Sequence, residues 1–181
     1  MKNVKYFVLM LGCLLVVGSN IGSAQTVSVA LSGVSCGTGN ASSFPVGTFS
    51  VTGTSTDKLG AVGGSLTGVV NLTDLLITKA LDPCSADLIR LFVSGKKIAT
   101  VTLTETTPTG AGGPPHNPIT ITLTGAYISN YSINGAPGAK PSEVVDFLFS
   151  KVCVTTVSQN PNGSLESPQT VCYDPITRIV S

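Results

Sequence analysis

The sequence predicts an all-β protein, built as an antiparallel two-sheet β-barrel or sandwich with one short flanking α-helix. Apolar residues recur at every second position through most of the chain, which is the period of a half-buried strand. Threonine and serine usually separate them, only 10% of the residues are charged, and glycine and proline gather between the alternating runs. Hydroxyl-bearing side chains suit the solvent face of an antiparallel sheet.

The first 24 residues have the order of a secretory signal peptide. Lys2 and Lys5 supply a charged start, Tyr6 to Val17 form an apolar run, and small residues follow up to Ala24. The apolar run is shorter than the roughly 20 residues that a membrane span needs. We therefore expect cleavage after Ala24 and a secreted or periplasmic protein; a retained anchor and lipidation at Cys13 are the alternatives.

Residues 25–181 have the length of one ordinary domain, so we expect a single domain after the signal peptide (residues 1–24). Loss of the two signal lysines leaves eight basic residues against nine acidic ones. This balance provides no strong attraction for nucleic acid or for an anionic membrane. We expect neither as a partner of the mature protein.

Strands are predicted wherever apolar and hydroxyl residues alternate. The clearest runs are 27–31, 49–51, 101–103 and 119–123. The segments 52–64 and 109–118 are rich in glycine or proline and are predicted to be loops. Antiparallel pairing follows, with one face of each strand in the core and one in water.

One segment changes to a helical period. Three apolar residues stand at i, i+3 and i+4, namely Leu88, Leu91 and Phe92. Ser85 precedes them as an N-cap residue and Gly95 follows them at the position of a left-handed C-cap. The pattern predicts a helix over about residues 86–94.

The segment 143–157 is apolar on both faces of a predicted strand. One face carries Val145, Phe147 and Phe149, and the other carries Val144, Leu148, Val152 and Val154. Such a strand is either covered on both sides within the chain or forms part of a subunit interface. The predicted helix is the candidate cover within one chain.

Four cysteines remain after signal cleavage: Cys36, Cys84, Cys153 and Cys172. An even number of cysteines in an exported chain predicts two disulfides, and three pairings can form from four residues. We favour Cys153 with Cys172, which joins two late segments expected to be neighbours in a sheet. The remaining pair, Cys36 with Cys84, then ties an early loop to the start of the helix.

The residues that catalysis or metal binding requires are sparse, so we expect no enzyme, no cofactor and no metal site. His116 is the only histidine and is expected to lie exposed in the 109–118 loop, without the partners of a zinc site or a serine triad. The carboxylates are scattered, and we expect them to be solvated or to act as capping residues rather than as the pair of a glycosidase. They are Asp57, Asp74, Asp82, Asp87, Glu105, Glu143, Asp146, Glu166 and Asp174.

The segment 72–103 resembles the haemolysin-coregulated protein (Hcp) family of type VI secretion. The family's strand ending in F-T-K, its Asp, its Ser-capped helix and its G-K-x-I turn have counterparts in Ile77-Thr78-Lys79, Asp82, Ser85 and Gly95-Lys96-Lys97-Ile98. The segments 121–136 and 143–154 look like the family's later strands, the second of them with the pattern E-x-V-x-F-x-F-x-K-I. Leu31-Ser32-Gly33-Val34 is a weaker counterpart of the first strand.

The resemblance implies hexameric rings that stack into a secretion tube, with other type VI components as further partners. Residues 52–68 would then correspond to the family's protruding loop. A signal peptide and four cysteines depart from the family's usual cytoplasmic pattern. The leading expectation is an exported Hcp-like structural or effector protein without catalysis. The alternative is a monomeric secreted, disulfide-stabilised β-domain that binds a protein, a glycan or a small ligand.

Overall fold

The computed structural model describes residues 25–36, 42–55, 70–108 and 115–181. The predicted signal peptide (1–24) and most of the 52–68 loop lie outside these residues. The elements are β1 (Thr26–Leu31), β2 (Ser43–Val46), β3 (Thr48–Ser55), β4 (Val70–Ala80), α1 (Ser85–Ser94), β5 (Ile98–Thr107), β6 (His116–Asn134), β7 (Ser142–Leu148), β8 (Lys151–Thr156), β9 (Gln169–Asp174) and β10 (Ile179–Val180). No described helix has the length and apolar character needed to cross a membrane.

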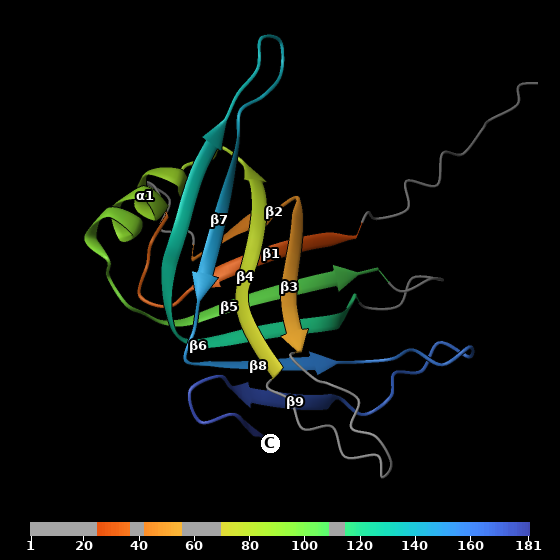
Figure 1. Ribbon diagram of the computed structural model, residues 1–181. Helices are drawn as coiled ribbons and strands as arrows, with labels where there is room; N and C mark the ends of the chain where they lie inside the picture. The colour runs from red at the N-terminus through yellow and green to blue at the C-terminus, as the bar shows by residue number, and fades with distance from the viewer. Residues whose placement is uncertain (1–24, 37–41, 56–69, 109–114) are drawn as a thin grey trace, which may run out of the picture.

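The described strands form two packed antiparallel sheets. The large sheet has the order β2-β1-β5-β6-β8-β9-β10, and the small sheet has the order β3-β4-β7-β6. The strands of the two sheets cross at a steep angle, and α1 lies at one side of the crossing (Figure 1). This is the predicted all-β two-sheet architecture with one flanking helix, in its orthogonally packed form.

The 19-residue strand β6 belongs to both sheets because it bends at Gly125. Gly125 has φ +63°, and a Cβ atom there would lie 2.5 Å from Ser150 Oγ. Only glycine tolerates this backbone and this approach without strain. Ser150 lies in the matching bend between β7 and β8, and its N–H donates to Thr124 O at 3.0 Å. The two bends together form the corner that joins the sheets.

The alternating residues fill the core as predicted. In one row of the large sheet, the buried Phe44, Val29, Leu103 and Ile121 stand opposite one another on successive strands. Threonine and serine occupy the other face of the same strands, in the row Ser28, Thr104, Thr120, Thr155 and Thr170. The four predicted alternating runs all lie in strands.

The predicted helix is present and begins one residue earlier than expected. Ser85 is its first residue and Cys84 is the N-cap, without a side-chain cap hydrogen bond. The expected role of Ser85 as N-cap was therefore wrong, because its hydroxyl group makes longer-range contacts instead. Gly95 ends the helix at φ +59°, and the Lys96 N–H donates to Leu91 O at 3.2 Å. This is the expected glycine C-cap.

Three loop and strand predictions were wrong. The segment 143–157 is two strands, β7 and β8, which belong to different sheets. Residues 52–55 of the loop expected over 52–64 continue β3, and the rest of that segment lies outside the described residues. Residues 116–118 of the loop expected over 109–118 belong to β6, and residues 109–114 lie outside the described residues. The last two errors share one cause: pairing with a neighbouring strand overrides weak local strand preference.

Candidate functional site

A buried ion pair joins two strands of the small sheet. Lys79 of β4 stands opposite Glu143 of β7, and their side chains are 1% and 0% exposed. Lys79 Nζ donates to Glu143 Oε1 at 2.5 Å and lies 2.8 Å from Asp82 Oδ1. A buried charge is tolerated only when it is paired and hydrogen-bonded. The expectation that Glu143 would be solvated or capping was therefore wrong.

The same carboxylate holds the helix and the second half of β6. Ser85 Oγ donates to Glu143 Oε1 at 2.9 Å and accepts the Asp82 N–H at 3.0 Å. The Tyr131 hydroxyl donates to Glu143 Oε2. Burial of the ring, followed by the neighbouring Glu143, raises the pKa of Tyr131 well above its ordinary value. We call Lys79, Asp82, Ser85, Tyr131 and Glu143 the ionic cluster.

The ionic cluster brings residues of the segments 72–103 and 143–154 into contact. Each of its members is a hydrogen-bond or ion-pair partner of another, so the cluster fastens α1 to β4, β6 and β7. Its charged groups all form ion pairs or hydrogen bonds within the cluster. Such a network stabilises the fold. Sequence reasoning missed Glu143 because its partner Lys79 is 64 residues away.

The outer face of the small sheet carries an exposed apolar patch. Leu148 of β7 and Tyr127 of β6 are direct neighbours in register and are 47% and 42% exposed. Leu76 and Val144 lie on the same face and are half-buried. We call Leu76, Tyr127, Val144 and Leu148 the outer patch. Large apolar side chains gathered on one sheet face are typical of an interaction surface.

Part of the outer patch was predicted correctly from the sequence. Val144 and Leu148 belong to the outer patch, whereas Val152 lies in the core at 1% exposure, because the chain changes sheets before it. The helix does not cover this face: Leu88 and Leu91 point into the core, and Phe92 stacks on Tyr131 at 6.2 Å between ring centroids. The interpretation that α1 shields Leu148 was therefore wrong.

A second apolar surface lies on the helix side of the molecule. Val93 is strongly exposed and Ile89, Phe92 and Ile133 are partly exposed. This surface and the outer patch are made of different residues. A contact between two different surfaces of the same chain is heterologous, and repeating it generates rings when the rotation closes. The strand β3 and the second half of β6 also bound the small sheet without a further described strand beyond them.

The cysteines lie in the favoured pairs, at disulfide distance. The Cα atoms of Cys36 and Cys84 are 4.4 Å apart, and those of Cys153 and Cys172 are 4.0 Å apart. Both separations bring the sulfur atoms into bonding range. The first pair links the loop after β1 to the start of α1, and the second links β8 to β9 in register.

His116 lies at the start of β6, opposite Thr107. It is half-buried, so its expected exposure in a loop was wrong. Its Nδ1 atom is buried and has no hydrogen-bond partner among the described residues. Within the same residues, no group of three or more His, Cys, Asp or Glu side chains could hold a metal ion. Asp57 lies outside the described residues.

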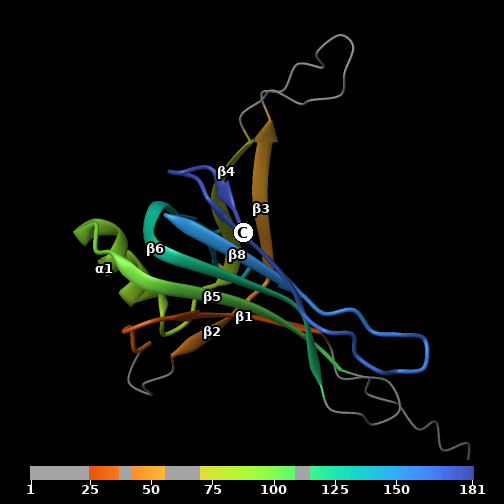
Figure 2. The ribbon, with the colours of Figure 1, turned by 90° about the horizontal axis from the view of Figure 1, so that it is seen from below.

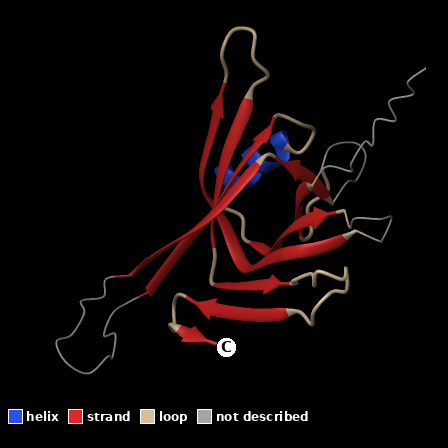
Figure 3. Cartoon of the chain, turned by 90° about the vertical axis from the view of Figure 1, so that its right-hand side faces the viewer, coloured by secondary structure: helices blue, strands red, loops and turns tan. Residues whose placement is uncertain are grey.

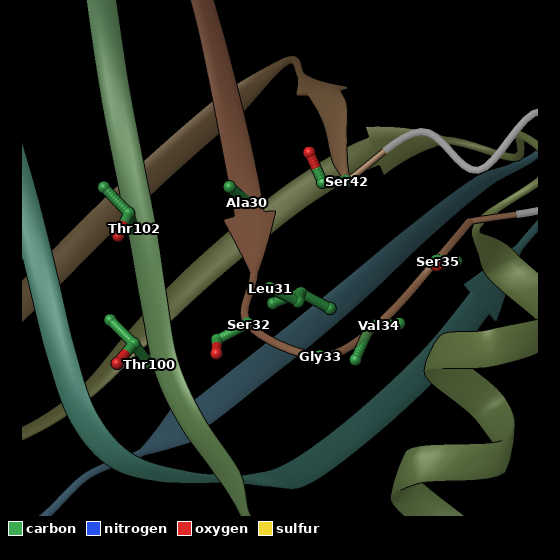
Figure 4. A pocket seen from close by; sticks show the side chains of 9 residues that line it. All are labelled: Ala30, Leu31, Ser32, Gly33, Val34, Ser35, Ser42, Thr100 and Thr102. Atoms are coloured by element: carbon green, nitrogen blue, oxygen red, sulfur yellow. The ribbon is translucent and has the colours of Figure 1, made fainter.

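A shallow pocket of about 480 Å³ opens beside the turn after β1 (Figure 4). Hydroxyl groups dominate its polar lining, which consists of Ser32, Ser35, Ser42, Thr100 and Thr102. No charged side chain lines it. It suits a neutral polar ligand better than an ionic one.

The sequence of this chain is similar to one known protein family over most of its length. Residues 5–155 match the sequence profile of the family described as "Type VI secretion system effector, Hcp". No curated protein gave a significant match.

Solved structures share the fold at low sequence identity. A protein described as a type six secretion system protein is 22% identical, with a TM-score of 0.75 over 87% of this chain and 100% of its own. Hcp1 from Salmonella typhimurium is 19% identical, with a TM-score of 0.66 over 87% of this chain and 99% of its own. Hcp3 from Pseudomonas aeruginosa is 17% identical, with a TM-score of 0.55 over 83% and 98%.

Proposed function

This chain belongs to the Hcp family of type VI secretion effectors, and we propose that it is an exported structural protein that assembles into rings and has no catalytic activity. The observation that carries the proposal is the outer patch. Leu148 and Tyr127 extend from a sheet face that nothing in the described chain covers. A neighbouring subunit would remove these apolar side chains from water, which favours association.

One carboxylate lies on the outer face of the small sheet. Asp146 lies among the residues of the outer patch, and its Oδ2 accepts a hydrogen bond from Asn130 Nδ2 at 3.1 Å. Its Oδ1 is buried and has no hydrogen-bond partner among the described residues. Buried carboxylate oxygens are costly when they are unpaired. This oxygen is enclosed within the subunit itself, so the apolar side chains of the outer patch, and not Asp146, carry the proposed contact.

Export is the second part of the proposal. The signal pattern of residues 1–24 and the two cysteine pairs at disulfide distance support passage into an oxidising compartment. Secreted material should begin at Gln25 on N-terminal sequencing. An intact Met1 on the accumulated protein would contradict the export of this chain.

The absence of catalysis is supported by where the titratable residues lie. His116 is separated from the ionic cluster by its position at the opposite end of β6. The carboxylates of the ionic cluster, Asp82 and Glu143, are ion-paired with Lys79, and Glu143 also accepts a hydrogen bond from the Tyr131 hydroxyl group. We therefore expect His116→Ala to retain fold and assembly, as measured by circular dichroism and light scattering.

The ring hypothesis is tested by size-exclusion chromatography with light scattering on wild type, Leu148→Asp and Ile176→Asp. Leu148 is 47% exposed, so a carboxylate there is solvated in the monomer and buried without a partner in an assembly. Ile176 is a matched apolar residue, strongly exposed in the turn before β10. We expect a multimeric wild type, a folded monomer for Leu148→Asp and a multimer for Ile176→Asp.

A wild type that stays monomeric at high concentration would refute ring formation. It would favour a monomeric binding domain instead, and the uncharged pocket beside β1 is the feature that would serve it. Substitution of Thr102 by lysine, on the wall of that pocket, would then abolish ligand binding. In the ring hypothesis the same change leaves the assembly intact.

A further inference from the structure

The two cysteine pairs differ in how solvent reaches them. Cys36 and Cys84 are 4% and 1% exposed and belong to the hydrophobic core. Cys153 and Cys172 are half-exposed and stand directly opposite each other on the hydroxyl-rich face of the large sheet. Thiol–disulfide exchange requires access of the attacking thiolate to a sulfur atom. A reductant in solution therefore meets Cys153–Cys172 first.

The accessible pair secures a peripheral part of the fold. β9 pairs with β8 on one side and with β10 on the other, so among the described strands β8 alone links it to the rest of the large sheet. These last strands and the C-terminus lie at one end of the molecule, away from the β6–β7 hairpin (Figure 3). The loop between β8 and β9 projects at the end opposite α1 (Figure 2). The family match ends at Thr155, before this loop.

The unit formed by β9 and β10 covers the edge of β8. Tyr173 is buried beside Val152, and Val171 stands opposite Val154 but is 58% exposed. The row of apolar side chains on the large sheet is therefore partly exposed to solvent where it reaches β9. The Cys172 N–H and C=O are both hydrogen-bonded to Ser181, at 2.8 and 3.0 Å, which ties the end of the chain to the same unit.

We propose that Cys153–Cys172 is a redox switch that controls attachment of the β9–β10 unit to β8. A thiolate of a small thiol attacks one sulfur, forms a mixed disulfide and releases the other cysteine as a thiolate. A second thiolate then releases the first cysteine, and the reductant leaves as its own disulfide. Two electrons have been transferred, and the two cysteine thiolates take up two protons to become thiols. Cys36–Cys84 remains oxidised.

Reduction weakens the attachment without unfolding the domain. The pair closes a loop across a sequence separation of 19 residues. Removing a restraint of this length increases the population of the opened loop by up to about 200-fold. The opened state exposes the hydrogen-bonding edge of β8 together with Val152 and Val154. An unpaired edge of this kind is a template for another strand. The proposal goes beyond ring formation and requires only that the accessible disulfide forms.

Hydrogen exchange with mass spectrometry tests this switch on the exported protein. The variants are Cys153→Ser with Cys172→Ser, and the control pair Cys36→Ser with Cys84→Ser. We expect residues 169–181 to exchange at least tenfold faster in the first variant than in wild type, with β5 unchanged. Wild type treated with glutathione should behave like the first variant. In the control variant, the exchange rate of residues 169–181 relative to that of the other strands of the large sheet should be the same as in wild type.

Alkylation of the glutathione-treated protein identifies the bond that is reduced. Cys153 and Cys172 should be labelled while Cys36 and Cys84 are not. Labelling of Cys36 and Cys84 first, or exchange of residues 169–181 within twofold of wild type after loss of the pair, would overturn the proposal. So would four free thiols before any reductant is added. Repeating the measurement on Leu148→Asp separates this result from the fate of the ring hypothesis.

Discussion

Replacing Glu143 by alanine removes the acceptor at the centre of the ionic cluster. Lys79 would keep Asp82, which is partly exposed, but would lose its buried partner. The hydroxyls of Ser85 and Tyr131 would lose the same carboxylate. Breaking a buried ion pair from one side costs about 3–5 kcal/mol. With about 4 kcal/mol lost, a chain of this length should melt about 8–16 °C lower.

The assay is urea unfolding followed by circular dichroism, with the midpoint and the slope fitted together. Glu143→Gln keeps an acceptor for the two hydroxyls and should lose less. The double variant Lys79→Met with Glu143→Leu removes both charges, and its stability should recover to within about 2 kcal/mol of wild type. A loss below about 1 kcal/mol for Glu143→Ala would refute the reasoning. So would a double variant less stable than the single one.

Two further predictions concern backbone geometry and pH. Gly125→Ala forces a Cβ against Ser150 Oγ at a positive φ, so it should lower the free energy of unfolding by about 1–3 kcal/mol. Gly135→Ala, where no atom lies within 4 Å of the added Cβ, is the control in the same urea assay, and equal effects would contradict the corner argument. The pKa of Tyr131 is raised by burial and by Glu143. The unfolded chain loses this phenolic proton near pH 10 while the folded chain keeps it. The contribution to stability is therefore full below about pH 10 and falls as pH rises above it. Tyr131→Phe should flatten this alkaline loss in pH-dependent urea unfolding and Tyr127→Phe should not; an unchanged slope in Tyr131→Phe would count against the assignment.

Much of the architecture could be predicted from local pattern. The alternation of threonine with valine, isoleucine and leucine in β5 and β6 specifies which side chains face the core, because successive residues of a strand point to opposite sides. The spacing i, i+3 and i+4 before Gly95 specifies α1, because residues at these positions lie on one face of a helix. The pairing of Cys153 with Cys172 was favoured because segments close together in the sequence tend to be neighbours in a sheet, and Cys36 with Cys84 was the pair that remained.

The candidate contact surface was only partly predictable. Val144 and Leu148 were recognised from a segment that is apolar on both faces, but Val152 was assigned to the wrong environment. In such a segment the period does not reveal where a strand changes sheets. The bend at Ser150 depends on the close approach of Gly125, which is 25 residues earlier in the chain.

The sequence by itself determined the strand faces, the short helix and the set of four cysteines, because each depends on the spacing of neighbouring residues. Only the tertiary structure decided that Glu143 is buried, that β7 and β8 lie in different sheets, and that Leu148 remains exposed. These outcomes depend on partners such as Lys79, 64 residues distant from Glu143. A carboxylate far from its cation in the sequence has the pattern of a surface residue. Its burial is decided only when the fold brings the two charges together and removes the water between them.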